Sequence, residues 1–324
     1  MTPSGITSSA LVIALPSKGR LKEQTEAWLS DCGFRLETAG GDRGYRARLS
    51  GLPDAEVRLL SASDIAQSLD AGDVHLGLTG EDLLRERGGD VDSRVLLLRA
   101  LGFGRADLVV AAPQSWIDVD TMADVDEVAH AYLARNGRRM RVATKYHVQT
   151  RAFFAAHGVA DYRIVESLGA TEGAPAAGMA ELVVDITSSG ATLSANNLKI
   201  LGDGVILRSQ AQLAASLTAA WTDRQIATLN RLMSVIEGRA AGRQLCALSW
   251  PVALQATAAA SVARWVTPAA ALRPDGMLVQ GSDLFDVAGA LAAAGVGPVT
   301  VTRPDYVFAA RSEPVERLCA RLGR

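Results

Sequence analysis

The chain has 324 residues and a formal net charge of −2, and 48% of its residues are hydrophobic while only 5% are aromatic. Roughly two or three domains are expected at this length. The near-neutral charge and the few aromatic residues argue against nucleic acid and anionic membranes as partners. No apolar run reaches membrane-spanning length, and residues 1–9 lack the pattern of a signal peptide.

The cysteines Cys32, Cys246 and Cys319 are few and widely spaced. They predict neither a disulfide framework nor a zinc site, and the four histidines have no paired ligand spacing. We therefore expect a protein of the reducing cytoplasm, without a metal site built from histidine and cysteine.

The first 30 residues combine a strand, a charged turn and a helix. Residues 11–15 are apolar over the length of a strand, and residues 21–29 have the pattern of a helix. Between them, Lys18 and Arg20 flank Gly19 at the end of the predicted strand, where open α/β sheets bind ligands. Two cations there suit an anionic ligand. They could instead be solvated at the helix start, although the helix macrodipole disfavours positive charge at that end.

A similar turn follows the strand predicted over 74–78. Thr79 and Glu81 stand between this strand and a helix predicted over 82–87, which places them at the same edge of a sheet. Glu81 also fits the simpler role of an acid in the first turn of a helix. His75 lies within the strand, a position that favours a structural histidine over a catalytic one.

Strands and helices continue to alternate through the middle of the chain. Strands are predicted at 108–113, 141–144 and 162–165, and helices at 121–135, 148–157 and 176–180. This alternation predicts an α/β protein with mainly parallel or mixed sheets.

The strongest local signal is the stretch from Val183 to Leu193. A β-branched run ends in Asp185 and leads into a loop of small and hydroxyl-bearing residues: Thr187, Ser188, Ser189, Gly190, Ala191 and Thr192. Such a loop can present several backbone N–H and hydroxyl groups to one anion. Asp185 could accept hydrogen bonds from sugar hydroxyls or hold a hydrated Mg²⁺. The pattern suits a phosphorylated sugar, but a Ser/Thr-rich turn between strand and helix has the same sequence features.

The last third of the chain predicts a further unit. A turn is expected at 202–204, a strand at 205–209 and one long helix over 213–237. The glycine-bearing polar segment 238–243 is the best candidate for a linker. Beyond it, a small α/β domain is predicted from strands at 245–248, 277–280 and 299–302 and helices at 254–263 and 282–294.

Together these motifs resemble the ATP phosphoribosyltransferase family. The matching segments follow the family's order within residues 9–236: Leu15–Leu21, Asp73–Glu81, Gly102–Arg105, Arg141–Tyr146 and Glu172–Leu193. The resemblance implies that N1 of the ATP adenine displaces pyrophosphate from C1 of 5-phosphoribosyl 1-pyrophosphate, with Mg²⁺ present. The product would be N1-(5-phosphoribosyl)-ATP, formed in the first step of histidine biosynthesis.

The resemblance also implies roles for individual residues. Asp185 is expected to hold the ribose hydroxyls, and residues 187–192 the 5-phosphate. The residues expected to contact ATP are Lys18, Gly19, Arg20, Thr79, Glu81 and Arg105. Lys18 and Arg20 would join Asp185 as catalytic residues. Glu172 would face the metal ion, and Lys145 would add a cation near the two polyanionic substrates.

The architecture implied by the resemblance is a two-lobed core like that of periplasmic binding proteins, with the active cleft between the lobes. The expected units are 1–104 with 201–238, 105–200, and a C-terminal domain over 239–324. Long-form members carry a C-terminal domain that binds histidine, whereas short-form members need a regulatory subunit related to histidyl-tRNA synthetase. The tail favours the long form, and residues 265–268 resemble its ligand loop. Inhibition by histidine and a dimer that builds to a hexamer are therefore expected.

Two other functions stay open at this point. A two-lobed module that binds a small molecule without catalysis would share the architecture. However, no signal peptide, helix-turn-helix segment or basic patch marks an exported receptor or a DNA-binding regulator. A phosphoribosyltransferase that acts on another base is the second alternative, although the acidic pair typical of nucleotide-salvage enzymes is not the pattern around Asp185.

Overall fold

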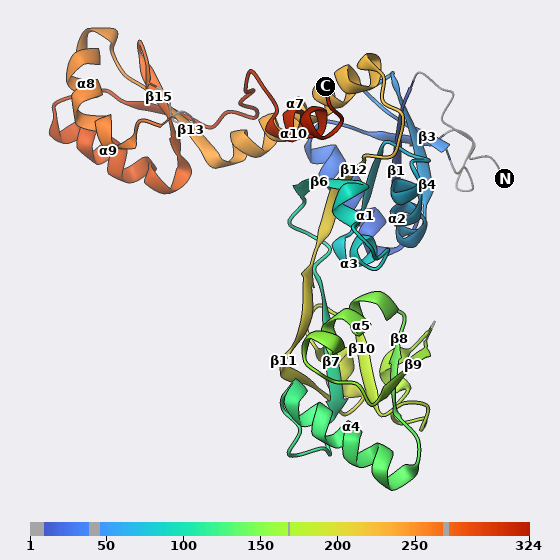
Figure 1. Cartoon of the computed structure of the whole chain (residues 1–324). Coiled ribbons are helices and arrows are strands. Elements are labelled where there is room, and N and C mark those ends of the chain that lie inside the picture. Colours follow the sequence, from blue (N-terminus) through green and yellow to red (C-terminus); the bar gives the residue numbers. More distant parts are fainter. Residues whose placement is uncertain (1–9, 39–45, 168, 268–271) are drawn as a thin grey trace.

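The computed structural model describes residues 10–38, 46–167, 169–267 and 272–324. These residues form three β-sheets, each covered by helices (Figure 1). The expected fold class is confirmed: the protein is α/β, with a two-lobed core and a small C-terminal α/β unit. Over the described ranges, no helix is long and apolar enough to cross a membrane. The signal-peptide prediction concerns residues 1–9, which lie outside the described residues.

The first lobe is built on a seven-stranded sheet in the order β2-β3-β4-β1-β5-β12-β6. Its strands are β1 (Leu11–Pro16), β2 (Leu36–Thr38), β3 (Arg46–Leu49), β4 (Ala55–Leu60), β5 (Leu76–Gly80), β6 (Val95–Ala100) and β12 (Ala211–Ser216). β1 pairs in parallel with β4 and β5, so these three strands have their carboxyl ends at one edge. Helices α1 (Gly19–Asp31), α2 (Ala62–Ala71) and α3 (Glu81–Arg85) follow β1, β4 and β5 at that edge.

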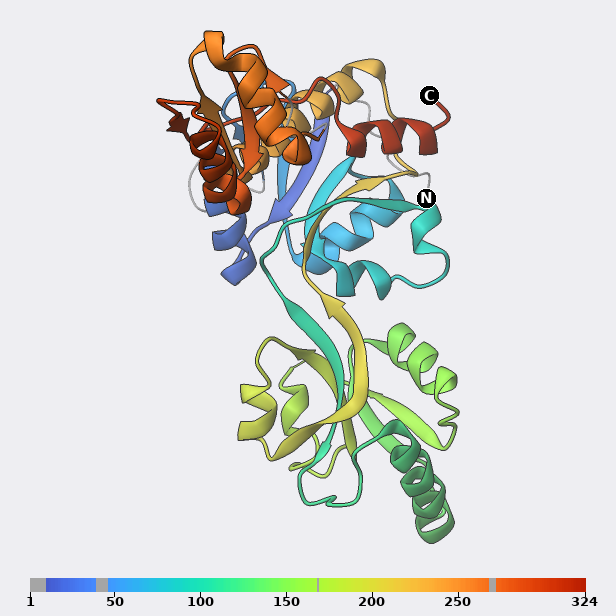
Figure 2. The ribbon, with the colours of Figure 1, turned by 90° about the vertical axis from the view of Figure 1, so that its left-hand side faces the viewer.

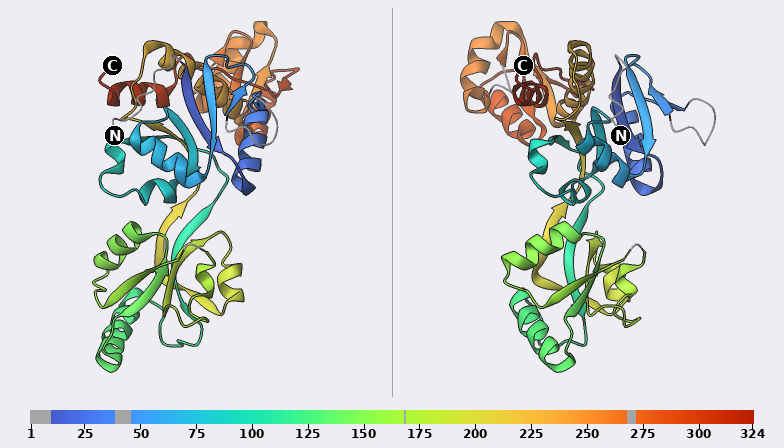
Figure 3. Two further views of the ribbon diagram at one scale, coloured as in Figure 1. Left: turned by 90° about the vertical axis from the view of Figure 1, so that its right-hand side faces the viewer. Right: turned by 45° about the vertical axis from the view of Figure 1, so that its right-hand side comes forward.

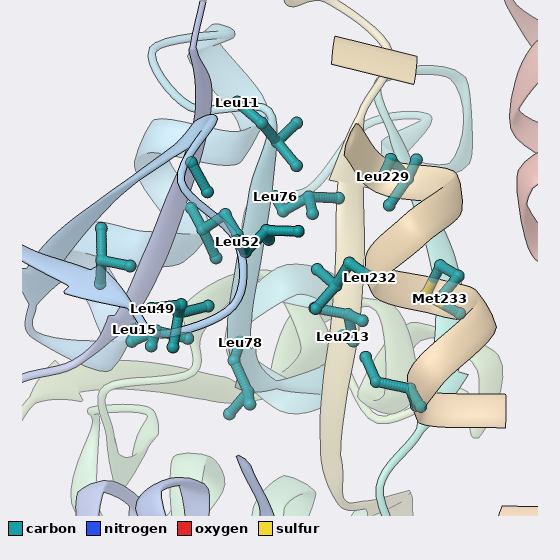
Figure 4. Packing of buried hydrophobic residues seen from close by; sticks show 14 of the residues in the cluster. Leu11, Leu15, Leu49, Leu52, Leu76, Leu78, Leu213, Leu229, Leu232 and Met233 are labelled. Atoms are coloured by element: carbon teal, nitrogen blue, oxygen red, sulfur yellow. The ribbon is translucent and has the colours of Figure 1, made fainter. Parts of the chain in front are cut away.

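Helix α7 (Asp223–Gln244) closes one face of this sheet. It begins with a capping box between Thr222 and Gln225, which satisfies two backbone donors at the helix start. Figure 4 shows Leu229 and Leu232 of α7 directed toward Leu213 of β12. All three leucines are buried, and each contributes about 2 kcal/mol to the free energy of folding.

The prediction of one helix over 213–237 is wrong in its first part. Residues 211–216 are the strand β12, which is antiparallel to both β5 and β6, and α7 begins only at Asp223. Every residue of β12 is buried. Its alanine-rich sequence therefore forms a central strand because tertiary packing overrides its helical propensity.

The predicted linker 238–243 is also wrong, because α7 continues through it to Gln244. Gly238 and Gly242 lie where the returning chain passes the helix. A Cβ on Gly242 would collide with the backbone of Asp305, and Val307 donates its N–H to the Gly238 carbonyl at 2.9 Å. These glycines permit close packing rather than flexibility.

The second lobe is a five-stranded sheet in the order β11-β7-β10-β8-β9. Its strands are β7 (Ala106–Pro113), β8 (Met140–Thr144), β9 (Tyr162–Glu166), β10 (Leu182–Thr187) and β11 (Leu198–Ser209). Its helices are α4 (Met122–Asn136), α5 (His147–Ala156) and α6 (Ala191–Ala195). β8 is parallel to both β9 and β10, so these strands also end at one edge.

Two smaller expectations in this lobe are wrong. Residues 176–180 form turns rather than a helix, because Gly178 adopts a positive φ of 66° just after Pro175. Residues 202–204 are not a separate turn but part of β11, whose pairing with β7 changes register between Ile200 and Val205. The extra residues are accommodated as an irregularity of the ladder.

Two segments join the lobes. β7 and β11 run antiparallel, and Figure 2 shows them side by side as the chain passes from one lobe to the other. Ala106 pairs with Ser209 at the lobe boundary, and a single residue, Gln210, separates β11 from β12. The lobes are therefore connected by a two-stranded hinge.

The third unit has a four-stranded sheet in the order β14-β15-β13-β16. Its elements are β13 (Leu245–Ser249), α8 (Gln255–Val262), β14 (Leu272–Arg273), β15 (Gly276–Gln280), α9 (Leu284–Ala293) and β16 (Thr300–Thr302). β13, β15, β16, α8 and α9 match the strands and helices predicted there, whereas the short strand β14 was not predicted. Figures 1 and 3 place this unit beside the first lobe and away from the second.

The chain then returns to the first lobe. Helix α10 (Glu313–Arg321) buries Val315 and Leu318 in the same hydrophobic cluster as the seven-stranded sheet. Arg317 donates to the Leu98 carbonyl of β6 at 3.2 Å. The third unit is thus held to the first lobe by α7 on one side and α10 on the other. The division of the chain into 1–104 with 201–238, 105–200 and 239–324 stays a prediction.

Candidate functional site

A cavity of about 380 Å³ lies between the two lobes. Its first-lobe lining comes from α1, the end of β5 and the starts of α2 and α3: Arg20, Leu21, Gln24, Ala62, Gly80, Asp82 and Leu83. Its second-lobe lining is Ile186, Thr187, Ser188, Ser189 and Thr192, and the hinge adds Gly104, Arg105 and Ala106. The parallel strands of both lobes therefore direct their carboxyl ends into one cleft, where α/β proteins bind ligands.

On the first-lobe side, the β1–α1 turn brings a cation to the cavity. Lys18 is the N-cap residue of α1 and Gly19 has a φ of 71°, a conformation that favours glycine. Arg20 follows and lines the cavity. Gln24 lies one helical turn further. Its buried Oε1 atom has no hydrogen-bond partner among the described residues, so the cavity wall contains an unsatisfied hydrogen-bond acceptor.

On the second-lobe side, the loop 187–192 keeps its donors available. Gly190 has a φ of 74° and donates its N–H to Thr187 Oγ1 at 2.8 Å, which holds the loop in a tight turn. Over the described part of the chain, the backbone N–H groups of Ser188, Ser189 and Thr192 have no hydrogen-bond partner. All three residues are exposed, so these groups can meet an anion without first breaking a bond.

Asp185 lies near the end of β10, two residues before this loop. Burial raises the pKa of its carboxyl group, and the nearby Glu172 carboxylate raises it further. The Ile186 N–H, which donates to Asp185 Oδ1 at 2.8 Å, and the Lys145 ammonium oppose this shift. The net pKa is above the ordinary value. Asp185, Lys145 and Glu172 are thus close enough to act on one another.

A polar contact joins the lobes next to the cavity, and we call it the interlobe junction (Asp82, Glu86, Tyr146, Gln149 and Ser209). Asp82 of α3 is buried and accepts from the Tyr146 hydroxyl at 2.7 Å and from the Ser209 hydroxyl at 2.8 Å. Burial, followed by the Asp82 charge, raises the pKa of Tyr146 far above its usual range. The Tyr146 hydroxyl is therefore a donor at every physiological pH.

The rest of the interlobe junction uses the start of α5. Glu86 accepts from the backbone N–H groups of Val148 and Gln149 at 2.8 and 3.2 Å, and the Gln149 amide donates to the Asp82 carbonyl at 2.9 Å. A carboxylate placed on free N–H groups at a helix start is a favourable pairing. The junction therefore fixes α3 of one lobe against α5 of the other.

The predicted site residues fall into two groups. Six of them line the cavity: Arg20, Arg105, Thr187, Ser188, Ser189 and Thr192. The others do not line it: Lys18, Gly19, Thr79, Glu81, Glu172, Asp185, Gly190 and Ala191. Gly19, Gly190 and Ala191 belong to the same turns as lining residues, and Glu81 lies between the lining residues Gly80 and Asp82.

Thr79 and Glu81 have structural partners. Thr79 is buried and donates its hydroxyl to the Ala62 carbonyl at 2.8 Å, which ties β5 to α2. Glu81 forms an ion pair with Arg85 at 3.4 Å and accepts from the Gln212 amide at 2.9 Å. Their roles in ATP binding stay predictions, while the contacts show that both residues support the cavity wall.

The structural role expected for His75 is confirmed. Its ring is buried, accepts from the Val12 N–H at Nδ1 and faces the Ala220 carbonyl with Nε2 at 3.1 Å. Burial lowers its pKa, and because Nδ1 accepts from the Val12 N–H, the ring carries its proton on Nε2, toward the Ala220 carbonyl. Both nitrogens are occupied by backbone groups of the first lobe.

Comparison with known proteins agrees with this geometry. A family model described as ATP phosphoribosyltransferase matches residues 61–238. An ATP phosphoribosyltransferase of Caulobacter vibrioides (strain NA1000 / CB15N) is 66% identical over 315 residues, which cover 97% of this chain and 98% of that protein. Another, of Bradyrhizobium sp. (strain ORS 278), is 59% identical over 233 residues, or 72% of each chain.

The chain belongs to the ATP phosphoribosyltransferase family. Membership makes it a transferase, and a two-lobed binding module without catalysis is not favoured. The solved ATP phosphoribosyl transferase (HisG:HisZ) complex from Thermotoga maritima contains a similar chain, with 26% sequence identity and a TM-score of 0.54. The alignment covers 70% of the present chain and 98% of that one.

The ATP phosphoribosyltransferase site includes residues that the sequence did not reveal. Asp82 and Gln24 reach the cavity or its junction only through contacts between distant segments, such as the bond from Ser209 to Asp82. Position 80 requires glycine, because a Cβ there would collide with Asp82 Oδ1. Its position between Thr79 and Glu81 was the one signal that could have drawn attention to it.

The described residues contain no group of three or more His, Cys, Asp or Glu side chains arranged to hold a metal ion. Asp185 and Glu172 nevertheless supply two neighbouring carboxylates. Mg²⁺ is commonly held by one or two carboxylates together with substrate phosphates. The donor set of this ATP phosphoribosyltransferase therefore fits a metal ion that arrives with its polyphosphate substrate.

Proposed function

We propose that this chain condenses ATP with 5-phosphoribosyl 1-pyrophosphate to give N1-(5-phosphoribosyl)-ATP and pyrophosphate. The main support for the proposal is the interlobe cavity. Its wall contains both the loop 187–192, which has unpaired backbone N–H donors, and the cations Arg20 and Arg105. Family membership supports the reaction, and this pairing of a donor loop with cations suits two phosphate-bearing substrates.

The proposed roles follow from chemistry. N1 of adenine carries no proton and attacks C1 with its own electron pair, so no strong general base is needed. The bond from C1 to the pyrophosphate oxygen breaks, and that oxygen keeps the electron pair. The protein then acts mainly by positioning both substrates and by stabilising charge at the departing phosphates. Arg20 and Arg105, with Lys18 and Lys145 near the cleft, would supply that stabilisation.

In this scheme the loop 187–192 holds the 5-phosphate and Asp185 accepts from the ribose hydroxyls. A bond to an ionised group is worth about 1.5–3 kcal/mol, enough to orient the ribose. The family uses a divalent metal ion, and we propose that it is Mg²⁺, held by the substrate phosphates with Asp185 and Glu172. The ion would neutralise charge on the leaving pyrophosphate.

The test of the reaction is turnover by the purified full-length chain with ATP, 5-phosphoribosyl 1-pyrophosphate, Mg²⁺ and pyrophosphatase, followed by the ultraviolet absorbance of the N1-substituted product. Asp185→Ala should lower kcat/KM by about 100-fold or more. Asp118→Ala, in a loop of the second lobe away from the cavity, is the matched control. Turnover that survives Asp185→Ala would refute the role of Asp185, and use of free bases in place of ATP would refute the acceptor.

We further propose that histidine inhibits the chain through the third unit and that the chain forms a dimer that builds to a hexamer. The support is the expected long form together with the described α/β unit beyond α7. One residue of the expected ligand segment 265–268, Pro268, lies outside the described residues. Initial rates at subsaturating substrate, with and without saturating histidine, test the inhibition. An unchanged rate without histidine binding would contradict it.

A further inference from the structure

A second basic concavity lies in the second lobe, outside the interlobe cleft. It has a volume of about 700 Å³, within the range of small-molecule sites. Five arginines line it, from the segment before β8, from β8 itself, from α5 and from β9: Arg138, Arg139, Arg141, Arg151 and Arg163. Tyr162 is also part of the wall, and no acidic residue is. We call this feature the arginine groove.

Adjacent strands bring two of these cations together. Arg141 of β8 and Arg163 of β9 are partners in the parallel ladder, so like charges stand side by side. Such a pair is unfavourable unless a negative charge compensates it. Arg141 has that compensation, because it donates to Glu181 at 2.8 Å from its side chain and at 2.7 Å from its backbone.

The carboxylates of the region are already used. Glu181 also accepts from Arg138 at 3.3 Å and from the Tyr132 hydroxyl at 2.8 Å. Burial opposes its ionisation, but the hydrogen bonds from Arg141 and then from Tyr132 outweigh burial and lower the pKa of Glu181 to about 2. Asp161 is shared between Arg139 at 4.0 Å and His130 at 3.3 Å.

Arg151 and Arg163 remain. Across the described ranges, neither side chain forms an ion pair or a hydrogen bond, and both residues are exposed. The five arginines thus exceed the two neighbouring carboxylates by three charges, in a chain whose net charge is −2. One guanidinium group can donate two parallel hydrogen bonds to the oxygens of a phosphate. Several guanidinium groups around one concavity therefore favour a ligand with linked phosphates over a single small anion.

The arginine groove is separate from the cleft. Arg141 and Arg163 are the second residues of β8 and β9, whereas the cleft takes up the carboxyl ends of the parallel strands. Lys145 follows Arg141 by four residue steps along the extended chain, which corresponds to roughly 13 Å. β9 is also the edge strand of its sheet, away from the hinge strands β7 and β11.

We propose that the arginine groove binds a small molecule that carries two or more linked phosphates, at a site distinct from the active cleft. Arg151 and Arg163 make the primary contacts, while Glu181 and Asp161 hold the other three guanidinium groups in place. The shared chemistry is a polyphosphate chain, which can come from an inorganic polyphosphate or from a nucleotide.

The experiment is isothermal titration of the full-length chain with tripolyphosphate, repeated with GTP to distinguish the inorganic and nucleotide sources. The proposal predicts two sites for tripolyphosphate in the unmodified chain. Arg151→Gln with Arg163→Gln should weaken one site at least 10-fold and leave turnover of ATP and 5-phosphoribosyl 1-pyrophosphate unchanged. Lysine at the same two positions keeps the charge but loses the paired geometry, and should weaken the site less.

The matched control is Arg46→Gln with Arg311→Gln, which removes two exposed arginines elsewhere. The proposal is overturned if this control weakens tripolyphosphate as much, or if Arg151→Gln with Arg163→Gln leaves every tripolyphosphate site unchanged. Tighter binding of GTP than of tripolyphosphate at the groove would identify a nucleotide as the ligand. Because this readout is binding, a failure of the proposed reaction would leave it intact.

Discussion

The two polar regions beside the interlobe cleft differ in how their hydrogen bonds are used. In the interlobe junction, the Asp82 carboxylate, the Glu86 carboxylate and the Tyr146 hydroxyl all have partners. In the loop 187–192, the N–H groups of Ser188 and Ser189 have none within the described residues. Satisfied buried groups fix a geometry, whereas open groups at a surface bind what arrives. Substitutions in the two regions should therefore affect different properties.

The largest expected effect is on substrate binding by the loop. Ser188→Ala, Ser189→Ala and Thr192→Val combined should raise KM for 5-phosphoribosyl 1-pyrophosphate about 100-fold, since three hydroxyl donors at roughly 1 kcal/mol each are lost. The melting temperature should stay nearly the same, because the one bond that these hydroxyls make within the fold is a long, exposed one from the Ala191 N–H to Ser189 Oγ at 3.4 Å. Steady-state kinetics and calorimetry measure the two properties. Ser194→Ala, on α6 outside the cavity, is the control, and a large loss of stability in the triple variant would contradict the prediction.

The interlobe junction should show the opposite pattern. Asp82→Ala leaves the buried Tyr146 hydroxyl without an acceptor, and should lower the free energy of the first unfolding transition by about 2–3 kcal/mol. Urea titration followed by tryptophan fluorescence gives this value. Asp92→Ala removes an exposed carboxylate that pairs with Arg85, and should cost less than about 0.5 kcal/mol. Equal effects of the two substitutions would show that the junction does not hold the lobes together.

The raised pKa of Asp185 gives a smaller, pH-dependent effect. An ordinary aspartate has a pKa of about 3.9, and the protonated form of Asp185 persists to a higher pH than that. On acidification, kcat/KM should therefore begin to fall at a higher pH than an ordinary aspartate would give. Glu172→Gln removes a like charge that raises the pKa of Asp185, and should move this fall to lower pH. The pH profile of kcat/KM measures the shift. Glu127→Gln on α4 should leave the midpoint unchanged, and an upward shift in Glu172→Gln would contradict the prediction.

The smallest expected effect concerns Gln24. Its buried Oε1 has no partner in the described chain, so Gln24→Leu should not lower stability. If ATP supplies the partner, the substitution should raise KM for ATP about 5-fold, equivalent to about 1 kcal/mol. Glu23→Gln, the neighbouring exposed residue, is the control. An unchanged KM would remove Gln24 from the substrate-binding surface.

Much of the fold could be predicted because apolar strands and capped helices are encoded locally. Residues 11–15 and 108–113 are strands as expected, and α4 starts at the capping box of Thr121. The exceptions are places where distant segments decide. The alanine-rich β12 is a strand only because β5 and β6 enclose it, and Gly242 is helical because residues near Asp305 pack on it.

The same distinction applies to the site. The loop 187–192 and the turn at Arg20 are visible in the sequence because each is one short segment with a chemical pattern. Asp82, Gln24 and the arginine groove depend on contacts between segments far apart in the chain, such as the pairing of Arg141 with Arg163. One sequence without an alignment carries no local signal of such contacts.

The return of the chain to the first lobe has a consequence for protein synthesis. The second lobe is continuous from β7 to β11, so its sheet can form as soon as Ser209 is free of the ribosome. The first lobe begins earlier but needs β12, α7 and finally Leu318 of α10 to complete its core. Translation proceeds at about 5–20 residues per second, so α10 is synthesised roughly 5–20 s after Ser209. The earliest strands of the first lobe lack this helix for that time. During that interval their apolar surface is open to chaperones, so the lobe that is translated first is the one that depends on them longest.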